Sequence, residues 1–302
     1  MKSVTQASSV SSPTKLPFIL HQAAVLAPGL NSLEQLRQAS AGTYQIDPQQ
    51  PFTLPPPQAL PANERRRSSQ SVRLVFACLE QLAQECPVSI SDLRSVFATD
   101  DGVGEISEQM FDILSGTRQV SPLTFPNSVH SATAGYFSIG YQNRQPSTVL
   151  SRGHESFAAG LLCAVTEALT TGEPVLFVCF DPAMTGLMQE VLPITQPTAC
   201  AWLLSAGGLN AGELSTGNQT LPALAHFVLT IESETRPASQ PTISLPTSLP
   251  HWLPAAWAPN ATSQSFAALG LLETPAQASY CLALGTQTLT LTCTSTSPGE
   301  AP

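Results

Sequence analysis

Three polar residues that could take part in catalysis stand side by side in the segment SRGHESF, at His154, Glu155 and Ser156. A serine beside a histidine can act as a nucleophile with its base, and His-Glu opens the HExxH pattern of zinc proteases. Ala158 occupies the position of the second histidine of that pattern, which excludes a zinc protease. The spacing from Gly153 to Ser156 also differs from the GxSxG nucleophile turn.

Metal and cofactor motifs are not indicated elsewhere. GVG at 102–104 is too short for a dinucleotide-binding loop. The seven cysteines form an odd set without CxxC spacing, and most lie in apolar runs such as GLLCAV. Buried free cysteine behaves as a small hydrophobe, so we expect reduced thiols in a cytoplasmic protein, with no metal and no cofactor.

Composition limits the classes of partner. The chain has 302 residues, of which 42% are hydrophobic, and its net charge is −9. An acidic chain with a single basic cluster, Arg65–Arg67, argues against nucleic-acid binding. The apolar stretch Leu16–Leu26 contains Pro17 and His21, so we interpret it as a first strand rather than a signal peptide. No apolar run is long enough to cross a bilayer, and we expect a soluble protein.

The residues around His154 are positioned by a strand, a turn and a helix. PSTVL (146–150) predicts a short strand, and Glu155–Thr170 a helix that ends at Thr171-Gly172. PVLFVCFD (174–181) follows as a fully buried strand. This alternation predicts an α/β protein with a mixed, mostly parallel sheet covered by helices.

Further elements complete the predicted domain. Helical spacing of apolar residues predicts helices, and β-branched or apolar runs predict strands. We expect a strand and turn at 94–102, strands at 199–207 and 226–233 that pair with each other, and helices at 32–41, 68–85, 105–114 and within 124–141.

The chain divides into three parts by composition. Residues 1–15 are expected to form a flexible arm, and 16–233 a single domain. The remainder, 234–302, is rich in Pro, Ser and Thr; we expect irregular structure over 236–265 and a last strand or hairpin at 279–294.

Four blocks together resemble the N-terminal half of a β-ketoacyl synthase: PANERRRSSQSVRL, VFATDDG, SPLTFPNSVHSATAGYFSIGY and SFAAGLLCAVTEALTTGEPVLFVCFD. The sequence is most similar to chain-length-factor-like proteins of aryl-polyene polyketide clusters. The likeness covers roughly residues 16–232. It implies a thiolase-like fold with a missing or heavily reduced C-terminal half.

In that family an acyl-carrying cysteine stands at a helix N-terminus, where the helix dipole favours its thiolate. Counting back from the helix end ALTTGE places that position on Glu155, with His154 and Ser156 as its neighbours. Cys163 lies two turns into the helix. The resemblance therefore implies that the condensing nucleophile is absent.

The family also uses two basic groups, normally histidines of the C-terminal half. After the four matched blocks the only histidines are His226 and His251, and neither has the surroundings that the family uses. We therefore expect no catalysis by this chain alone. For Glu155 we expect a helix-capping role worth about 1 kcal/mol or less; chain-length factors often carry glutamine there, and Glu departs from that pattern.

The resemblance implies an active ketosynthase as partner, together with an acyl carrier protein. The strand before the nucleophile position would pair across a heterodimer interface, because an uncovered β edge favours association. Interface or acyl-tunnel candidates are Met110, Phe111, Asn127, His130, Phe137, Ser147, Thr148, Val149 and Leu150. Core packing is the alternative for Met110, Phe111 and Phe137.

Two other functions stay open. One is a stand-alone acyltransferase or hydrolase that acts on acyl thioesters through Ser156 or His154. The other is a degenerate scaffold that binds only the acyl carrier protein.

Overall fold

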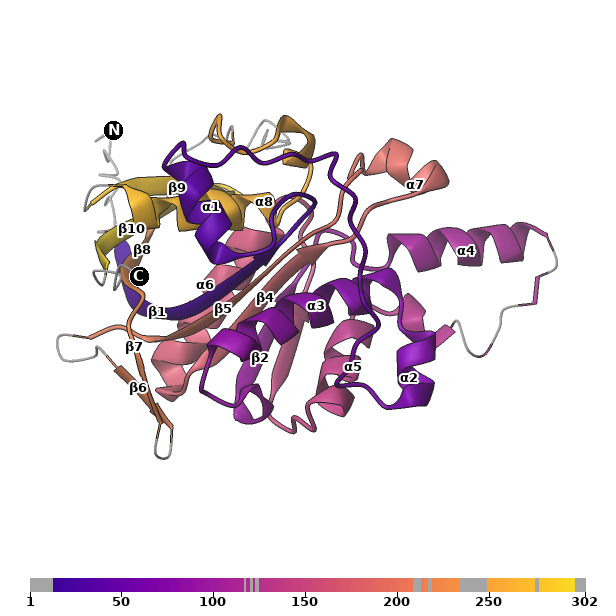
Figure 1. Ribbon diagram of the computed structural model, residues 1–302, viewed down its shortest axis with the longest axis horizontal. Coiled ribbons are helices and arrows are strands. Elements are labelled where there is room, and N and C mark those ends of the chain that lie inside the picture. The colour runs from indigo at the N-terminus through magenta and orange to yellow at the C-terminus, as the bar shows by residue number, and fades with distance from the viewer. Residues whose placement is uncertain are drawn as a thin grey trace, which may run out of the picture.

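The computed structural model describes residues 13–116, 118–119, 122, 125–208, 213–216, 219–233, 249–274 and 277–296. Figure 1 shows helices on both faces of one large twisted sheet. The expected flexible N-terminal segment (residues 1–15), apart from Pro13–Lys15, and residues 234–248 lie outside the described part.

The strands are β1 (Thr14–Leu26), β2 (Arg94–Ala98), β3 (Ser147–Leu150), β4 (Val175–Asp181), β5 (Thr198–Ala206), β6 (Glu213–Thr216), β7 (Gln219–Pro222), β8 (Ala225–Ser233), β9 (Ser279–Leu284) and β10 (Gln287–Thr296). The helices are α1 (Leu33–Ser40), α2 (Ala62–Arg67), α3 (Gln70–Glu85), α4 (Gly104–Ser115), α5 (Ala132–Gly140), α6 (Ser156–Thr171), α7 (Gly186–Val191) and α8 (Ser263–Leu269). Short 3-10 turns are η1 (Ile90–Asp92), η2 (Phe125–Ser128), η3 (Ala255–Trp257) and η4 (Gly270–Glu273).

The main sheet has eight strands in the order β3-β2-β4-β5-β1-β8-β10-β9. Only β2–β3 and β2–β4 pair in parallel, and the other neighbours in this sheet are antiparallel. The prediction of a mostly parallel sheet is therefore wrong. The reason is visible after β4, where the six-residue helix α7 provides no crossover and the chain turns straight back as β5.

Strand β1 lies between β5 and β8, which the sequence analysis had expected to pair with each other. Phe18 is the register partner of Ala206 on one side and of Phe227 on the other. The rings of Phe18 and Phe227 stack with centroids 5.4 Å apart. The first strand thus completes the centre of the sheet, a long-range pairing that local sequence does not reveal.

Alternate side chains of the central strands enter two separate cores. Trp202 of β5 packs on the face covered by α6, α1 and α8, whereas Leu203 packs on the face covered by α3 and α5. On the first face, Phe157 of α6 meets the Trp202 ring edge-on at 5.5 Å. Helix α6 is therefore anchored directly against the middle of the sheet.

Residues 249–265 are only partly irregular, because the 3-10 turn η3 and the start of α8 lie among turns and loops. Helix α8 is buried, and the ring of Trp257 meets that of Phe266 at 5.6 Å. The hydroxyls of Ser263 and Ser265 donate to the carbonyls of Asn260 and Thr262, so these polar residues are hydrogen-bonded inside the core. The Ser- and Thr-rich composition therefore conceals an ordered, buried segment.

Candidate functional site

The turn 151–155 joins the edge strand β3 to α6 at the carboxyl ends of the parallel strands β2, β3 and β4. Ligand and catalytic residues of α/β proteins commonly gather at such an edge. Gly153 has φ +58°, a left-handed conformation that favours glycine and lets the chain turn sharply into the helix.

Ser156 holds this turn together from the inside. Its side chain is fully buried, and its Oγ accepts a hydrogen bond from the Arg152 N–H at 2.8 Å. The same hydroxyl lies 2.9 Å from the Thr99 carbonyl and 2.7 Å from the Gly153 carbonyl, to either of which it can donate. A buried hydroxyl with these hydrogen bonds stabilises the turn. The geometry therefore offers no support for Ser156 as a nucleophile.

His154 does not form the serine–histidine pair that the alternative acyltransferase or hydrolase would need. Among the described residues no hydrogen bond connects its ring to Ser156, and its Nδ1 is buried without a hydrogen-bond partner. Its carbonyl oxygen accepts from Gln264 Nε2 at 2.8 Å. His154 thereby connects the turn to α8.

Glu155 occupies the N-cap position of α6, but its carboxylate makes no capping hydrogen bond to the helix. One oxygen instead accepts from the Gly285 N–H at 3.0 Å, and the other from Arg152 Nε at 2.7 Å. The expected stabilisation of the helix N-terminus by Glu155 therefore does not include a side-chain capping hydrogen bond, and its electrostatic part stays a prediction. The carboxylate fastens the β9–β10 turn to the start of α6.

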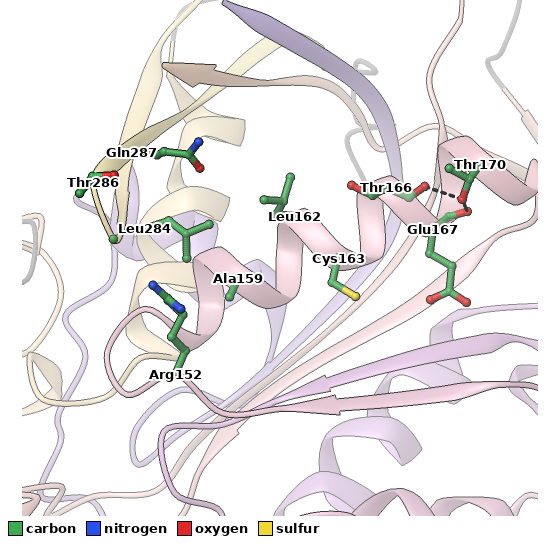
Figure 2. Close-up of a pocket in the computed structure, with 11 residues that line it drawn as sticks. Arg152, Ala159, Leu162, Cys163, Thr166, Glu167, Thr170, Leu284, Thr286 and Gln287 are labelled. Atoms are coloured by element: carbon green, nitrogen blue, oxygen red, sulfur yellow. Dashed lines mark hydrogen bonds between the residues drawn. The ribbon is translucent and has the colours of Figure 1, made fainter. Parts of the chain in front are cut away.

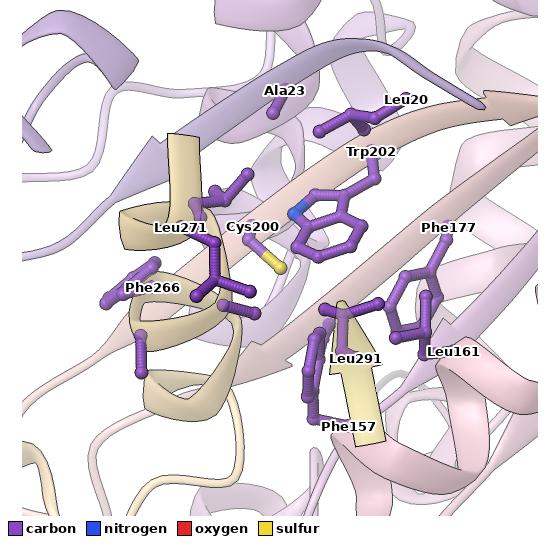
Figure 3. Packing of buried hydrophobic residues seen from close by; sticks show 14 of the residues in the cluster. Leu20, Ala23, Phe157, Leu161, Phe177, Cys200, Trp202, Phe266, Leu271 and Leu291 are labelled. Atoms are coloured by element: carbon purple, nitrogen blue, oxygen red, sulfur yellow. The ribbon is translucent and has the colours of Figure 1, made fainter. Parts of the chain in front are cut away.

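No cysteine of the described chain stands at the α6 N-terminus. Cys163 lies further along the helix (Figure 2), where burial raises the pKa of its thiol. Cys200 packs beside Trp202 in the core (Figure 3), where burial raises its thiol pKa to about 12. A condensing nucleophile needs a lowered thiol pKa, so both shifts have the wrong direction.

Two buried carboxylates beside this turn were missed by sequence reasoning. Asp100 follows β2, Asp181 ends β4, and the Asp100 N–H donates to Asp181 Oδ1 at 2.8 Å. Burial, then the charges of Asp181 and Asp101, raises the pKa of Asp100 to about 7. The available signal was an aspartate at or just after the end of each of two neighbouring strands, in TDDG and VCFD.

Asp181 also joins the C-terminal segment to the sheet. Its Oδ2 accepts from both the backbone N–H and the hydroxyl of Thr262, each at 2.7 Å. Its side chain is fully buried, and burial raises its pKa against the lowering effect of these hydrogen bonds. One carboxylate therefore ties β4 to the loop after β2 and to the start of α8.

The interface candidates separate into buried and exposed residues. Phe137 is in the core, with its ring 5.5 Å from that of Phe97, and Asn127 is buried with Nδ2 donating to the Arg67 carbonyl. Neither is available to a partner in this conformation. His130 is exposed, and Met110 is half-buried.

Phe111 belongs to a group of exposed apolar side chains. In the described part of the chain, every large hydrophobic residue that is clearly exposed lies on α4, α5, α7 or the segment between α4 and α5. Phe111 is 62% exposed, Leu187 73% and Val191 75%. The full set is Phe111, Leu114, Phe125, Val129, Ile139, Leu187 and Val191.

Helices α4 and α7 form one unit, here called the arm. Glu108 of α4 accepts a hydrogen bond from the Leu187 N–H at 2.9 Å and another from the Thr185 hydroxyl. Gly186 has φ +49°, a left-handed conformation that favours glycine, and a Cβ there would displace the Glu108 carboxylate. Figure 1 shows α4 projecting from the body of the molecule.

Strand β3 forms one end of the eight-stranded sheet and pairs only with β2 among the described strands. Ser147 and Thr148 are exposed, and Val149 and Leu150 are half-buried. The strand is therefore an accessible sheet edge, as the resemblance implied.

Comparison with known protein families identifies the family of this chain. Residues 36–246 match the family described as beta-ketoacyl synthase, N-terminal domain. The chain belongs to this family. No curated protein matches its sequence.

Solved structures agree on the fold. The chain is similar to a ketosynthase (ApeO) in complex with its chain length factor (ApeC) from Xenorhabdus doucetiae, with TM-score 0.64, 24% identity, and coverage of 92% of this chain and 99% of that one. It is also similar to the ishigamide ketosynthase/chain length factor, with TM-score 0.63, 13% identity and the same coverage. At these identities the likeness establishes the thiolase-like ketosynthase fold.

None of the helices in the described part of the chain is both long and apolar enough to cross a membrane. In the same part of the chain, no group of three or more His, Cys, Asp or Glu residues is arranged to hold a metal ion.

Proposed function

We propose that this chain is a non-catalytic, chain-length-factor-like partner of an active β-ketoacyl synthase in fatty acid or polyketide biosynthesis. The observation that carries the proposal is the apolar surface of α4, α5 and α7, together with the open edge of β3. Exposed apolar surface gathered at one region marks a contact with another protein.

The chemistry of the α6 turn supports the same conclusion. Glu155, at the position where we place the family's thiol, accepts a hydrogen bond from the Gly285 N–H, and the Ser156 side chain is buried. The partner therefore supplies the condensing cysteine, while an acyl carrier protein delivers its substrates. This chain stabilises the partner and shapes the space for the growing acyl chain.

The interface combines the β3 edge with the arm. Pairing of β3 with the equivalent strand of the partner would join the two sheets and satisfy its open hydrogen-bonding edge. Burial of residues such as Phe111 and Leu187 would add the hydrophobic contribution. Obligate interfaces of this kind bury roughly 2,000 Å² or more.

Co-expression with a cysteine-bearing ketosynthase tests the proposal. We expect a stable 1:1 complex in size-exclusion chromatography with light scattering. The double variant Leu187→Arg/Val191→Arg should weaken it by roughly 100-fold or more, because two apolar contacts become buried charges.

Ala41→Arg is the matched control, since Ala41 is exposed at the end of α1, outside the arm. It should leave the complex unchanged. A stable monomer that shows no association with the ketosynthase would refute the proposal.

A further inference from the structure

The arm carries charges of only one sign. The charged residues of α4 and α7 are Glu105, Glu108, Asp112 and Glu190, and neither helix contains Lys, Arg or His. Figure 1 shows the two helices at the same end of the molecule. In the described part of the chain, none of the four carboxylates is in an ion pair. The arm therefore combines its exposed apolar side chains with a negative charge that no neighbouring cation balances.

Local structure does not explain the two exposed carboxylates of this set. Asp112 and Glu190 are both exposed, and each lies in the last turn of its helix. The helix dipole favours cations at that end, so neither carboxylate is stabilised by the helix that carries it. Asp112 also follows Glu108 by four residues, a spacing at which like charges on a helix repel each other. These charges become favourable only when a cation approaches from outside the chain.

The neighbours of the two carboxylates indicate what kind of surface could approach. Phe111 precedes Asp112 and Val191 follows Glu190, and both apolar side chains are exposed. Protein interfaces commonly have an apolar centre with a polar rim, and Arg is enriched in them. An Arg or Lys of another chain can pair with each carboxylate through its charged end, while its aliphatic stem covers the adjacent apolar side chain.

A second copy of this chain fits the arm poorly. The chain has 21 acidic and 12 basic residues and a net charge of −9, so two copies repel each other. Its one basic cluster is Arg65–Arg67. The Arg65 side chain donates to the Leu60 carbonyl at 2.9 Å, and that of Arg66 is likewise hydrogen-bonded within the chain. Charge complementarity therefore favours a different, more basic surface.

We propose that the arm fits a basic surface of its partner, on which Arg or Lys side chains surround an apolar depression and pair with Asp112 and Glu190. The inference rests on the proposed function, because it takes the arm as the contact with the ketosynthase. It adds the chemistry that the ketosynthase presents there and the reason why a second copy is disfavoured. Opposite charges at an interface act mainly on the rate of association.

Surface plasmon resonance of the full chain with a cysteine-bearing ketosynthase tests this surface. The association rate constant should fall about ten-fold or more between about 50 mM and about 500 mM NaCl, because salt screens the attraction. Asp112→Lys/Glu190→Lys should slow association about ten-fold or more at low salt, with a smaller change in dissociation. The difference from the parent should shrink at high salt. Glu108 stays unchanged in this variant, because it joins α4 to α7 through the Leu187 N–H.

Glu34→Lys/Glu232→Lys is the matched control. Both residues are exposed and lie outside the arm, on α1 and β8, and the variant changes the net charge by the same amount. It should associate within about two-fold of the parent rate. Circular dichroism verifies that each variant is folded. Association that is indifferent to salt, or equal slowing in the two double variants, would overturn the inference.

A peptide probe tests the arm without the ketosynthase. In calorimetry, a short amphipathic helical peptide of Leu and Lys should bind the parent saturably, and its Leu and Glu counterpart should not. Binding of the Leu and Lys peptide should weaken about ten-fold in Asp112→Lys/Glu190→Lys and stay unchanged in Glu34→Lys/Glu232→Lys. Equal binding by the two variants would count against a basic surface as the occupant of the arm.

Failure of this inference is distinguishable from failure of the proposed function. A ketosynthase complex whose formation ignores both salt and the charges of the arm removes only the basic surface. Absence of any ketosynthase complex removes the proposed function, while peptide binding that depends on Asp112 and Glu190 still assigns a basic partner to the arm. Self-association of the parent that is lost in Asp112→Lys/Glu190→Lys would identify a second copy as the occupant and overturn the inference.

Discussion

The α6 turn and the arm differ in how their side chains are used. At the turn, polar residues are buried and joined to one another, as Ser156 and Asp181 show. On the arm, apolar residues such as Phe111 and Leu187 face outward. Under the proposed function, the turn corresponds to the family's reactive region and has a structural role in this chain, while the exposed surface of the arm contacts the partner. Substitutions should therefore affect stability at the turn and association at the arm.

Asp181→Asn should have the largest effect on stability. The amide cannot accept all of the hydrogen bonds that the carboxylate receives from Asp100 and Thr262, and its NH₂ group would face donors. We expect a loss of about 3 kcal/mol in the free energy of unfolding, measured by urea denaturation. A loss below about 0.5 kcal/mol would show that the turn is not organised around this carboxylate.

Asp100→Asn should change how stability depends on pH. The pKa of Asp100 is about 7 when folded and near 3.8 when exposed, so between these values the folded chain binds more protons than the unfolded chain. The free energy of unfolding of the parent therefore falls as pH rises from about 4 to 7. The variant should have a shallower slope and be more stable at pH 8 by about 2 kcal/mol. Parallel pH profiles would contradict the buried-pair interpretation.

Glu155→Ala should have a smaller effect. It removes the hydrogen bonds from Gly285 and Arg152, which lie at the surface of the molecule. We expect about 1 kcal/mol of destabilisation and faster amide exchange at Gly285, measured by NMR. Glu34→Ala, in the first turn of α1, is a control in another helix. Unchanged exchange at Gly285 in Glu155→Ala would show that Glu155 does not hold the β9–β10 turn in place.

Phe111→Ser should have the smallest effect on stability. Its ring is already largely in water, so the free energy of unfolding should stay within about 0.5 kcal/mol. Association with the ketosynthase should weaken about ten-fold or more, measured by calorimetry. Phe137→Ser is the contrasting variant, because it removes a core ring and should lower stability by several kcal/mol. Equal destabilisation by Phe111→Ser and Phe137→Ser would contradict the assignment of Phe111 to the surface and Phe137 to the core.

Sequence reasoning succeeded where local pattern was strong. The first strand at Leu16–Leu26, the helix after Glu155 and the buried strand 174–181 are confirmed by β1, α6 and β4. The β-ketoacyl synthase resemblance is also confirmed. Each of these rests on apolar periodicity or on a contiguous motif.

Features made by distant contacts were missed. Glu155 meets Gly285, and Asp181 meets Thr262, across long stretches of chain that have no shared pattern. Strand direction also escaped prediction, because it depends on whether a short helix such as α7 crosses over the sheet. The assignment of Glu155 as the equivalent of the nucleophile, and the division of the chain at 16–233, stay predictions.

Intact-mass spectrometry of the co-expressed complex, after incubation with an acyl thioester, shows which of the two chains carries the acyl group. We expect the ketosynthase to gain the mass of one acyl group while this chain keeps its own mass. Stoichiometric acylation of this chain, at Cys163 or at any other nucleophile, would contradict it.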